Sequence, residues 1–472
     1  ELLQMEDNRQ KEAGKWGLRS IIDSIEGDKV IWIVALLLIV ISVLVIFSST
    51  PLLGDKSRID IMKDQGLLAI GGLALIFFLY KCITRIGIYR FFSQFGFIVS
   101  FVLLAILDAH GKLDIGSIKA EYLNGAWRTL NISGLQLHVF EVVKVAMVMY
   151  LAWALHGMKQ DNEAMEKGQK SPTFRIANWM SEKKHLEFMK NPFAKRMFYI
   201  YIPIILISGM VLMGSNSSGI FIGGILIGTI LIGGIPFKEI FAAGAGLVVM
   251  FGVCFMIYKV SDGELMGRMG TLEGRLGNKI TTERLDRYEL ESDEFYDALD
   301  PLRQPYGAKV AIHEGGFLGK RIGNSTQKYY VAHIYSDYMF SFIIEEVGLA
   351  GGILIMLLYL SLIARCSTII SLCRNEFAKV AIGGLAFLIT GQAFLHISVN
   401  SGIIPLTGQT LPLLSDGATA FLTSCLAFGI ILSISKMVNT KMKQVEEAQL
   451  RSTDEIQERI SQLGQIEDQP NL

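Results

Sequence analysis

The chain has little charge for its length. Only 19% of its 472 residues are Asp, Glu, Lys or Arg, 51% are hydrophobic, and basic and acidic residues balance at 44 each. With a mean hydropathy of +0.42, this excludes an ordinary soluble protein, which needs far fewer apolar residues to fill its core, and indicates an integral membrane protein. The net charge of zero by itself points to no partner, and we expect no nucleic acid.

Cysteine is also scarce, and the five cysteines form neither a CxxC pair nor a Cys/His spacing for zinc. None of them falls in a segment that we expect on the extracytoplasmic side of the membrane. We therefore predict no disulfide and no structural metal, and we interpret these residues as small apolar side chains or free cytosolic thiols. They are Cys82, Cys254, Cys366, Cys373 and Cys425.

Several common catalytic patterns are missing. The chain has no GxxxxGK[ST] phosphate loop, no HExxH and no GxSxG. Their absence argues against ATP-driven transport and against the common hydrolase mechanisms. We expect no nucleotide, haem or flavin as a cofactor.

Long apolar runs dominate what is present, and a run of about 20 apolar residues spans a bilayer as a helix. The predicted fold class is an all-α polytopic membrane protein with about ten transmembrane helices and one long extracytoplasmic loop. The SNSS sequence in the break at 213–219 is either a tight turn between two spans or an interruption within one. The runs lie near 30–48, 66–82, 92–107, 138–156, 197–213, 219–234, 239–258, 336–364, 378–400 and 416–437.

Basic residues orient these spans. The segment 157–196 carries nine Lys or Arg residues and is expected in the cytoplasm, where positive residues are retained. Counting spans from this segment places both termini in the cytoplasm. The connections expected outside are 49–65, 108–137, 259–335 and 401–415.

The same reading divides the chain into three parts. A cytoplasmic N-terminal segment, 1–29, precedes a ten-helix membrane domain, 30–437, which includes the basic loop 157–196 and the long outer loop 259–335. A cytoplasmic C-terminal tail, 438–472, has helix-forming residues and i,i+4 charge pairs, and we expect it to be helical.

Charged side chains accompany the helices to membrane depth, where an unpaired charge is costly. Arg128 precedes the span that starts near residue 138, and Glu141 and Lys144 lie on the outer turns of that span. Their i,i+3 spacing places the two residues on one helix face. We expect them either to pair with each other or to bind a ligand.

The run near 336–364 carries three carboxylates. Asp337 precedes Glu345 by about 12 Å of helix, so Asp337 is expected at the outer surface while Glu345 and Glu346 reach into the bundle. Adjacent residues on a helix point about 100° apart, so one glutamate at most is expected to face a given cavity. Either that glutamate pairs with Lys144 and locks two helices together, or it binds a divalent cation such as Mg or Mn.

Two further polar segments flank these spans. The turn GGFLGKRIGNSTQK combines exposed backbone N–H groups with cations, which suits a diphosphate. The segment NSGIIPLTGQTLPLLSDGATAFL is tolerated at membrane depth only where it is buried in protein or lines a wet cavity. All four polar places lie toward the outer side and together predict one polar cavity for an amphiphilic, phosphorylated ligand. The candidate contacts in the turn are Lys320, Asn324, Ser325, Gln327 and Lys328.

Three stretches resemble the SEDS family (shape, elongation, division and sporulation), and most of all its FtsW branch. The resemblance covers most of the ten-helix region, and the GNSTQK element favours FtsW over RodA. The stretches are GAWRTLNISGLQ with the following Glu141 and Lys144, GGFLGKRIGNSTQK with HIYSDYMFSFIIEEVGLAGG, and QAFLHISVNSGIIPLTGQTLPLLSDGATAFLTSCLAFGIILSIS.

This resemblance implies a peptidoglycan glycosyltransferase that polymerises lipid II on the periplasmic face of the bacterial cytoplasmic membrane, for septal cell-wall synthesis during cell division. The implied partners are lipid II, undecaprenyl diphosphate-linked glycan, a class B penicillin-binding transpeptidase and other divisome membrane proteins. In the implied inverting reaction, the GlcNAc 4-hydroxyl of an acceptor attacks C1 of a donor MurNAc, and undecaprenyl diphosphate leaves. That chemistry needs a base for the hydroxyl and positive charge on the diphosphate.

The resemblance also implies site residues. The family's base is an Asp ahead of the Gly-Gly turn, commonly in a D-P-L-like context, and DALDPLRQPYGAKVAIHEGG offers Asp300 here, with Asp297 as the runner-up. Asp293 and Asp286 are nearby competitors. The candidate anion contacts are Arg128, Lys144, Lys320 and Lys328.

Three segments depart from the family pattern. HVFE stands where QPSE is common, NSSG where PDxG is common, and SDGAT where SYGGS is usual. Two other functions therefore remain open. One is a lipid flippase or transporter, because intramembrane Glu and Lys also mark substrate pathways. The other is a non-catalytic divisome scaffold. Against transport, the polar residues cluster on one side of the membrane.

Overall fold

The computed structural model describes most of the chain, but Asp286, one of the carboxylates near the expected base, lies outside the described residues. The described residues are 27–49, 58–109, 118–123, 126–132, 135–169, 173, 174, 177, 179, 181, 182, 187–261, 293–331 and 333–467.

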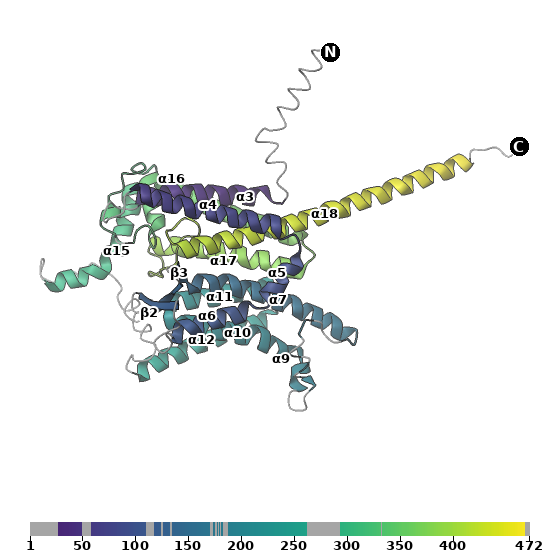
Figure 1. Cartoon of the computed structure of the whole chain (residues 1–472), viewed down its shortest axis with the longest axis horizontal. Helices are drawn as coiled ribbons and strands as arrows, with labels where there is room; N and C mark the ends of the chain where they lie inside the picture. Colours follow the sequence, from purple (N-terminus) through teal and green to yellow (C-terminus); the bar gives the residue numbers. More distant parts are fainter. Residues whose placement is uncertain are drawn as a thin grey trace, which may run out of the picture.

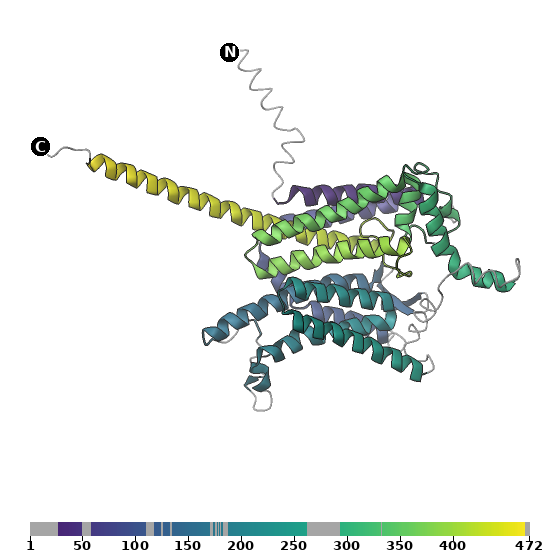
Figure 2. The same cartoon turned by 180° about the vertical axis from the view of Figure 1, so that it is seen from behind.

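Within these ranges, nine helices are long and apolar enough to cross a membrane, and α11 (Asn216–Ile232) is a shorter apolar helix. These ten correspond to the ten predicted runs, and they lie side by side in Figures 1 and 2. The nine are α3 (Lys29–Ser49), α4 (Arg58–Cys82), α5 (Ile86–Ser93) with α6 (Gly96–Ala109), α7 (Val139–Glu166), α9 (Pro192–Arg196) with the π-helical η3 (Met197–Tyr201) and α10 (Ile202–Gly214), α12 (Phe237–Val260), α16 (Met339–Leu372), α17 (Glu376–Asn400) and the first part of α18 (Ala418–Glu467).

The break at 213–219 is a tight turn between two helices. Ser215 has an extended backbone (φ −160°, ψ 110°), and its hydroxyl accepts the N–H of Ser218 at 3.4 Å. The helices α10 and α11 pack against each other on either side of this turn. The first alternative for the SNSS sequence is therefore confirmed.

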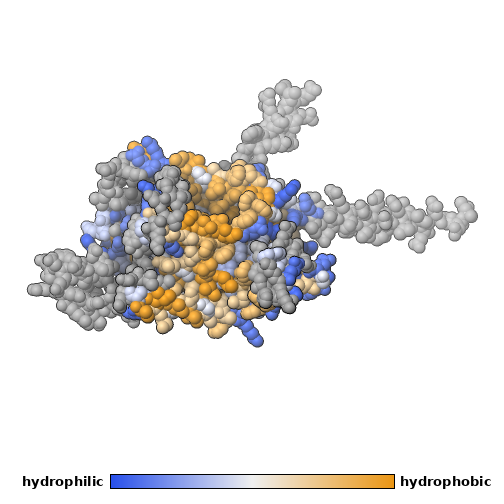
Figure 3. Space-filling view, turned by 60° about the horizontal axis from the view of Figure 1, so that its bottom comes forward, coloured by the Kyte–Doolittle hydropathy of each residue, from blue (hydrophilic) through white to orange (hydrophobic). Residues whose placement is uncertain are grey.

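The bundle has two distinct ends. The helix α15 (Asp293–Gly315) and a small sheet lie at one end, on the left in Figure 1, and α9 and the far part of α18 lie at the other. We call these the sheet end and the tail end. Between them, the face in Figure 3 carries a hydrophobic belt, and hydrophilic residues gather toward both ends, as expected for a bundle that crosses a bilayer.

The sheet was not predicted. Strands β1 (Ile118–Leu123), β2 (Ala126–Ile132) and β3 (Leu135–His138) pair antiparallel in the order β1-β2-β3. The Asn-Gly dipeptide between IKAEYL and AWRTLNI is a hairpin signal that hydropathy alone does not reveal. The hydroxyl of Thr419 accepts the His138 N–H at 3.3 Å and donates to the Gln136 carbonyl at 3.0 Å, so β3 is attached to the start of α18.

The helices differ in how deeply they are buried. In α17, 78% of the most apolar window is buried inside the protein, whereas in α12 the share is 11%. The helix α17 packs against α7, α11, α16 and α18. It therefore lies at the middle of the bundle, and the polar residues described below are arranged around it. The helix α18 continues to Glu467 without a break at the boundary expected near 437.

Candidate functional site

A buried lysine lies at the centre of the bundle. Lys144 on α7 is 2% exposed, and its Nζ donates to the Oε1 atoms of Glu141 at 2.6 Å, Gln392 at 2.8 Å and Gln409 at 3.1 Å. These contacts use the three donors of an ammonium group. The shared helix face of Glu141 and Lys144 is confirmed, and the two residues pair with each other. We call Lys144, Glu141, Gln392 and Gln409 the lysine centre.

The two glutamines connect the lysine centre to other segments. Gln392 on α17 donates its Nε2 to the carbonyl oxygen of Thr410 at 3.0 Å, and Gln409 donates its Nε2 to the hydroxyl of Ser218 on α11 at 2.8 Å. The connection 401–417 therefore folds back over the centre. Its residues 409 and 411–415 are buried, as expected for a non-helical segment at membrane depth.

A polar stripe on α17 continues from the lysine centre toward the sheet end. The Nδ1 of His396 lies 2.8 Å from the carbonyl oxygen of Gln409, and its Nε2 accepts the Phe340 N–H at 3.4 Å. The Oδ1 of Asn400 accepts the N–H of Ser341 at 3.0 Å. The motif reading did not single out these residues, although Gln392, His396 and Asn400 recur every four residues and so share one helix face.

The two glutamates of α16 bind the loop of residues 320–328. Glu345 is fully buried and accepts the Thr326 N–H at 2.9 Å, the Ser325 hydroxyl and the Nζ of Lys320 at 3.0 Å. Its Oε1 also lies 3.3 Å from the N–H of Gln327. Backbone N–H groups, a hydroxyl and an ammonium group together replace the water that this carboxylate loses on burial.

Glu346 completes the same contact from the next position. It is buried and accepts the Ser48 hydroxyl of α3 at 2.7 Å and the Gly323 N–H at 2.9 Å. The Nζ of Lys328 donates to the carbonyl oxygens of Gly323 at 2.9 Å and Ser48 at 3.3 Å. We call these two glutamates with the 320–328 loop and Ser48 the carboxylate lock.

The expectation that one of these glutamates pairs with Lys144 is wrong. The 320–328 loop wraps around this part of α16 and meets both carboxylates, although they point in different directions from the helix. Lys144 takes its partners from the lysine centre instead. The Nδ2 of Asn324 is also used inside the loop, where it donates to the Lys320 carbonyl at 3.1 Å.

The carboxylate lock as folded does not fit a divalent cation. Its carboxylate oxygens face N–H, hydroxyl and ammonium donors, which would have to leave before a metal could bind. Within the described ranges, no group of three or more His, Cys, Asp or Glu side chains is arranged to hold a metal ion. The divalent cation stays a prediction without assigned ligands.

Lys320 remains an ammonium group at ordinary pH. Partial burial lowers its pKa, but hydrogen bonds and the negative charge of Glu314 and Glu345 outweigh this, so the pKa of Lys320 is raised above its ordinary value. Its Nζ contacts Glu314, Glu345 and the hydroxyl of Thr326. The positive charge of Lys320 is thus matched by carboxylates of the chain itself.

The expected bases lie on a helix rather than in an irregular loop. The backbone places Asp297 and Asp300 in the first turns of α15 (Asp293–Gly315), which Asp293 opens. Ala308 and Ala311, about three turns further along from each of them, are fully buried. The buried contacts of α15 described here therefore come from its later turns, after both candidate bases.

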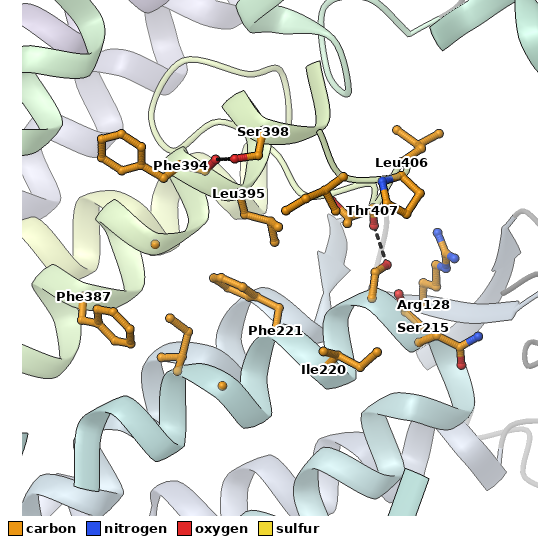
Figure 4. A pocket seen from close by; sticks show the side chains of 17 residues that line it. Arg128, Ser215, Ile220, Phe221, Phe387, Phe394, Leu395, Ser398, Leu406 and Thr407 are labelled. Carbon is orange, nitrogen blue, oxygen red and sulfur yellow. Dashed lines mark hydrogen bonds between the residues drawn. The ribbon is translucent and has the colours of Figure 1, made fainter. Parts of the chain in front are cut away.

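A cavity of about 650 Å³ opens between α11 and α17, beside the lysine centre. Figure 4 shows Ile220 and Phe221 of α11 facing Phe394 and Leu395 of α17, with Arg128 at one end. That end is polar, and its lining includes Arg128, Ser215, Ser217 and Thr407. The hydroxyl of Ser217 donates to the Thr407 carbonyl at 2.6 Å.

The ring of Phe221 lies between the cavity and the lysine centre. Its centroid is 5.6 Å from the Nζ of Lys144, and the same ring lines the cavity. Lys320 and Lys328 are not among the lining residues and contact the carboxylate lock instead. The four polar places were predicted to form one cavity, but they form two separate sites. One site contains Arg128, Glu141, Lys144 and the 401–417 segment, and the other is the carboxylate lock.

Asp337 lies two residues before α16. Its carbonyl oxygen accepts the Nδ2 of Asn400 at 3.1 Å, so it marks the point where α16 and α17 meet.

The fold and the site define a polytopic α-helical membrane protein in which a charged centre is buried beside an apolar cavity with a cationic end. The family model described as cell cycle protein, for FtsW, RodA and SpoVE, matches residues 28–440. The chain belongs to this family.

Individual relatives agree with this assignment. The chain is 26% identical over 439 residues to the probable peptidoglycan glycosyltransferase FtsW of Enterococcus hirae, covering 90% of this chain and 96% of that protein. It is similar to the crystal structure of RodA from Thermus thermophilus with a TM-score of 0.53 and 17% identity, covering 88% of this chain and 98% of that one. A chain in a structure described as a peptidoglycan synthase complex is similar with a TM-score of 0.53 and 18% identity, covering 87% and 97%. These structural likenesses confirm the fold.

Proposed function

We propose that this protein is a peptidoglycan glycosyltransferase that polymerises lipid II during bacterial cell division. The observation that carries the proposal is the cavity of about 650 Å³, with apolar walls from α11 and α17 and Arg128 at its polar end. Ligand pockets of roughly 300–1,000 Å³ commonly combine such walls with a few polar groups. A cavity of this kind suits a lipid-linked diphosphate, and the family membership and the FtsW relative support the same reaction.

The chain's own residues can be given roles in this reaction. The apolar walls take the first part of the polyprenyl chain, and Arg128 places positive charge beside the diphosphate as the bond from C1 to the phosphate oxygen breaks. Asp300, or Asp297 one turn earlier, takes the proton of the acceptor's 4-hydroxyl as that oxygen attacks C1 with inversion. Lys144 acts behind Phe221 as a positioning residue, because it holds Gln409 and with it the 401–417 segment.

The orientation and the partners follow from the same proposal. The sheet end faces the periplasm and the tail end the cytoplasm of the bacterial inner membrane, because Lys159, Lys195 and Arg196 lie toward the tail end. The partner is a class B penicillin-binding transpeptidase within the divisome. The structure described as a peptidoglycan synthase complex supports such an assembly, because one of its chains shares this fold.

A reconstituted polymerase assay tests this function. The full chain with its cognate transpeptidase is supplied with labelled lipid II, with and without Mn²⁺, and glycan chains are separated by gel. We expect polymer from the wild type and a loss of about 100-fold or more in either Asp300→Ala or Asp297→Ala, the scale for removing a general base. Glu294→Ala, on the first turn of the same helix, is the matched control and should retain polymer.

The other outcomes are also informative. Polymer that persists in both aspartate variants would exclude these residues as the base. A complete lack of polymer, together with movement of lipid II between leaflets of the same vesicles, would favour a flippase, and a lack of both would favour a scaffold.

A further inference from the structure

The turn of residues 316–323 begins directly after α15, overlaps the start of the 320–328 loop, and exposes three large apolar side chains. Phe317 is 65% exposed, Leu318 78% and Ile322 64%, in a connection that is otherwise polar. A soluble surface seldom presents three such side chains together without a binding role.

The position of this turn along α16 is fixed by the backbone. The N–H of Leu349 donates to the Gly316 carbonyl at 2.9 Å, and the N–H of Lys320 donates to the Glu345 carbonyl at 2.8 Å. Gly348, with φ +83°, interrupts α16 at this level and lets the backbone of the turn approach the backbone of α16. A Cβ added to it would lie 2.2 Å from the Phe317 carbonyl oxygen. The turn is therefore held beside residues 345–350.

The lengths of two helices indicate that the membrane boundary falls at the same level. Farther along α16, toward its C-terminal end, Arg365 pairs with Asp28 at 2.6 Å, and Asp28 directly precedes α3. A hydrocarbon layer of about 30 Å corresponds to about 20 helical residues, so its other edge meets α16 near residue 345. The length of α3 indicates the same boundary. Its 21 residues also match the thickness of the hydrocarbon layer, and Ser48 near its end contacts Glu346 at 2.7 Å. Two helices thus place the turn at the edge of the bilayer.

The turn also continues a surface that faces lipid. Leu349, Ile353 and Leu354 of α16 are exposed beside it, as expected for a span that contacts acyl chains. Arg321, with φ +76°, is exposed, and its side chain has no partner among the residues that the structure describes. Apolar side chains flanked by a guanidinium group match the interface between acyl chains and lipid phosphates.

We propose that the turn 316–323 is an interfacial membrane anchor. Phe317, Leu318 and Ile322 insert into the leaflet at the sheet end of the bundle, and the guanidinium group of Arg321 lies among the lipid phosphates. Because the turn directly follows Gly315, this anchor fixes the height of α15 above the membrane. The anchor requires only the membrane fold and is independent of the reaction proposed above.

Fluorophore labelling at single cysteines tests the anchor. An environment-sensitive dye is attached through Leu318→Cys to the full chain, with its five cysteines replaced by Ala, in nanodiscs that contain anionic lipid. Leu354→Cys on α16, 54% exposed, is the lipid-facing control, and Tyr306→Cys on α15, 66% exposed, is the water-facing control. We expect the dye at 318 to be quenched by spin-labelled lipid like that at 354 and to be shielded from iodide.

Two results would overturn the anchor. A dye at 318 that iodide quenches as it does at 306 would place the turn in water. A dye protected from both quenchers would show that protein, from another copy or a partner, covers the turn instead of lipid.

Hydrogen exchange then tests whether the anchor holds α15. The double variant Phe317→Asp with Leu318→Asp should speed exchange of the amides at 303–315 by roughly tenfold in nanodiscs, because two apolar side chains lose their lipid contact. Tyr306→Asp, on α15 itself, should leave exchange at 308–315 unchanged. Unaltered exchange in a double variant that elutes like the wild type would contradict an anchoring role.

Discussion

The lysine centre and the carboxylate lock both bury charge in the bundle, but their surroundings differ. Glu345 and Glu346 accept from backbone N–H groups, hydroxyls and Lys320, so their acceptor capacity is largely used within the chain. Lys144 faces a single carboxylate, Glu141, which is 17% exposed and whose Oε2 has no partner among the described residues.

The difference separates a structural role from a functional one. A buried carboxylate whose oxygens are saturated by donors of its own fold has nothing left for a ligand, so the lock stabilises the attachment of α15 and the 320–328 loop to α16. The lysine centre keeps spare acceptor capacity and adjoins the cavity through Phe221. Variants of the lock should therefore change stability first, and variants of the centre should change activity first.

The largest effect is expected from Glu345→Ala. The substitution leaves the Ser325 hydroxyl and the Thr326 N–H without this acceptor and removes one of the two carboxylates that Lys320 contacts, and each buried donor left unsatisfied costs about 1–3 kcal/mol. Thermal unfolding in nanodiscs measures the loss as a lower midpoint. Glu314→Ala is the control, because Glu314 also contacts Lys320 but is exposed and should contribute less than about 1 kcal/mol. Equal midpoints for the two variants would contradict the lock.

Lys144→Met should mainly reduce activity. The methionine fills the space but removes the donor that holds Gln409 and the 401–417 segment beside the cavity, and we expect polymerisation of lipid II to fall by about 100-fold, the scale seen when positioning is lost. Lys159→Met, which breaks an exposed pair with Glu376 at 2.7 Å, is the control. If Lys144→Met destabilised the protein as much as Glu345→Ala while the folded fraction kept full activity, the centre would be a second lock.

Two glycines of the turn distinguish backbone strain from close packing. Gly319 and Gly323 both have positive φ, but a Cβ on Gly319 would lie 2.3 Å from the Glu346 carbonyl oxygen, whereas nothing lies within 4 Å at Gly323. Gly323→Ala should cost about 1–2 kcal/mol from the left-handed backbone alone. Gly319→Ala should cost about 1–3 kcal/mol more, because the backbones must move apart. Similar unfolding midpoints would show that the turn is not clamped to α16.

The smallest effect is expected from filling the cavity. Gly224 lines the cavity, and a Cβ added there meets nothing within 4 Å, so we expect Gly224→Leu to extend into the cavity without backbone strain. We expect the KM for lipid II to rise about tenfold, which corresponds to about 1.4 kcal/mol, with an unchanged unfolding midpoint. Gly252→Leu on α12 is the control, because a Cβ added at Gly252 also meets nothing within 4 Å. An unchanged KM in Gly224→Leu would exclude this cavity as the lipid site.

Much of the fold could be predicted from the sequence, because hydropathy is a local property of consecutive residues. The ten apolar runs became the ten helices, and the spacing of Glu141 and Lys144 placed them on one face. The small sheet was missed because its strands contribute little hydropathy. The helix that carries Asp297 and Asp300 was missed because it is polar and short of aliphatic residues at its start.

The partners of the buried charges could not be predicted in this way. Glu346 binds Ser48, which is 298 positions away, and Lys144 binds Gln409 at a separation of 265. The sequence by itself determined that these charges enter the bundle, because each is attached to an apolar helix. Only the tertiary structure decided that Glu345 and Glu346 hold a loop while Lys144 holds the segment over the cavity, because a buried charge takes whichever donors and acceptors the packed helices bring within hydrogen-bond distance.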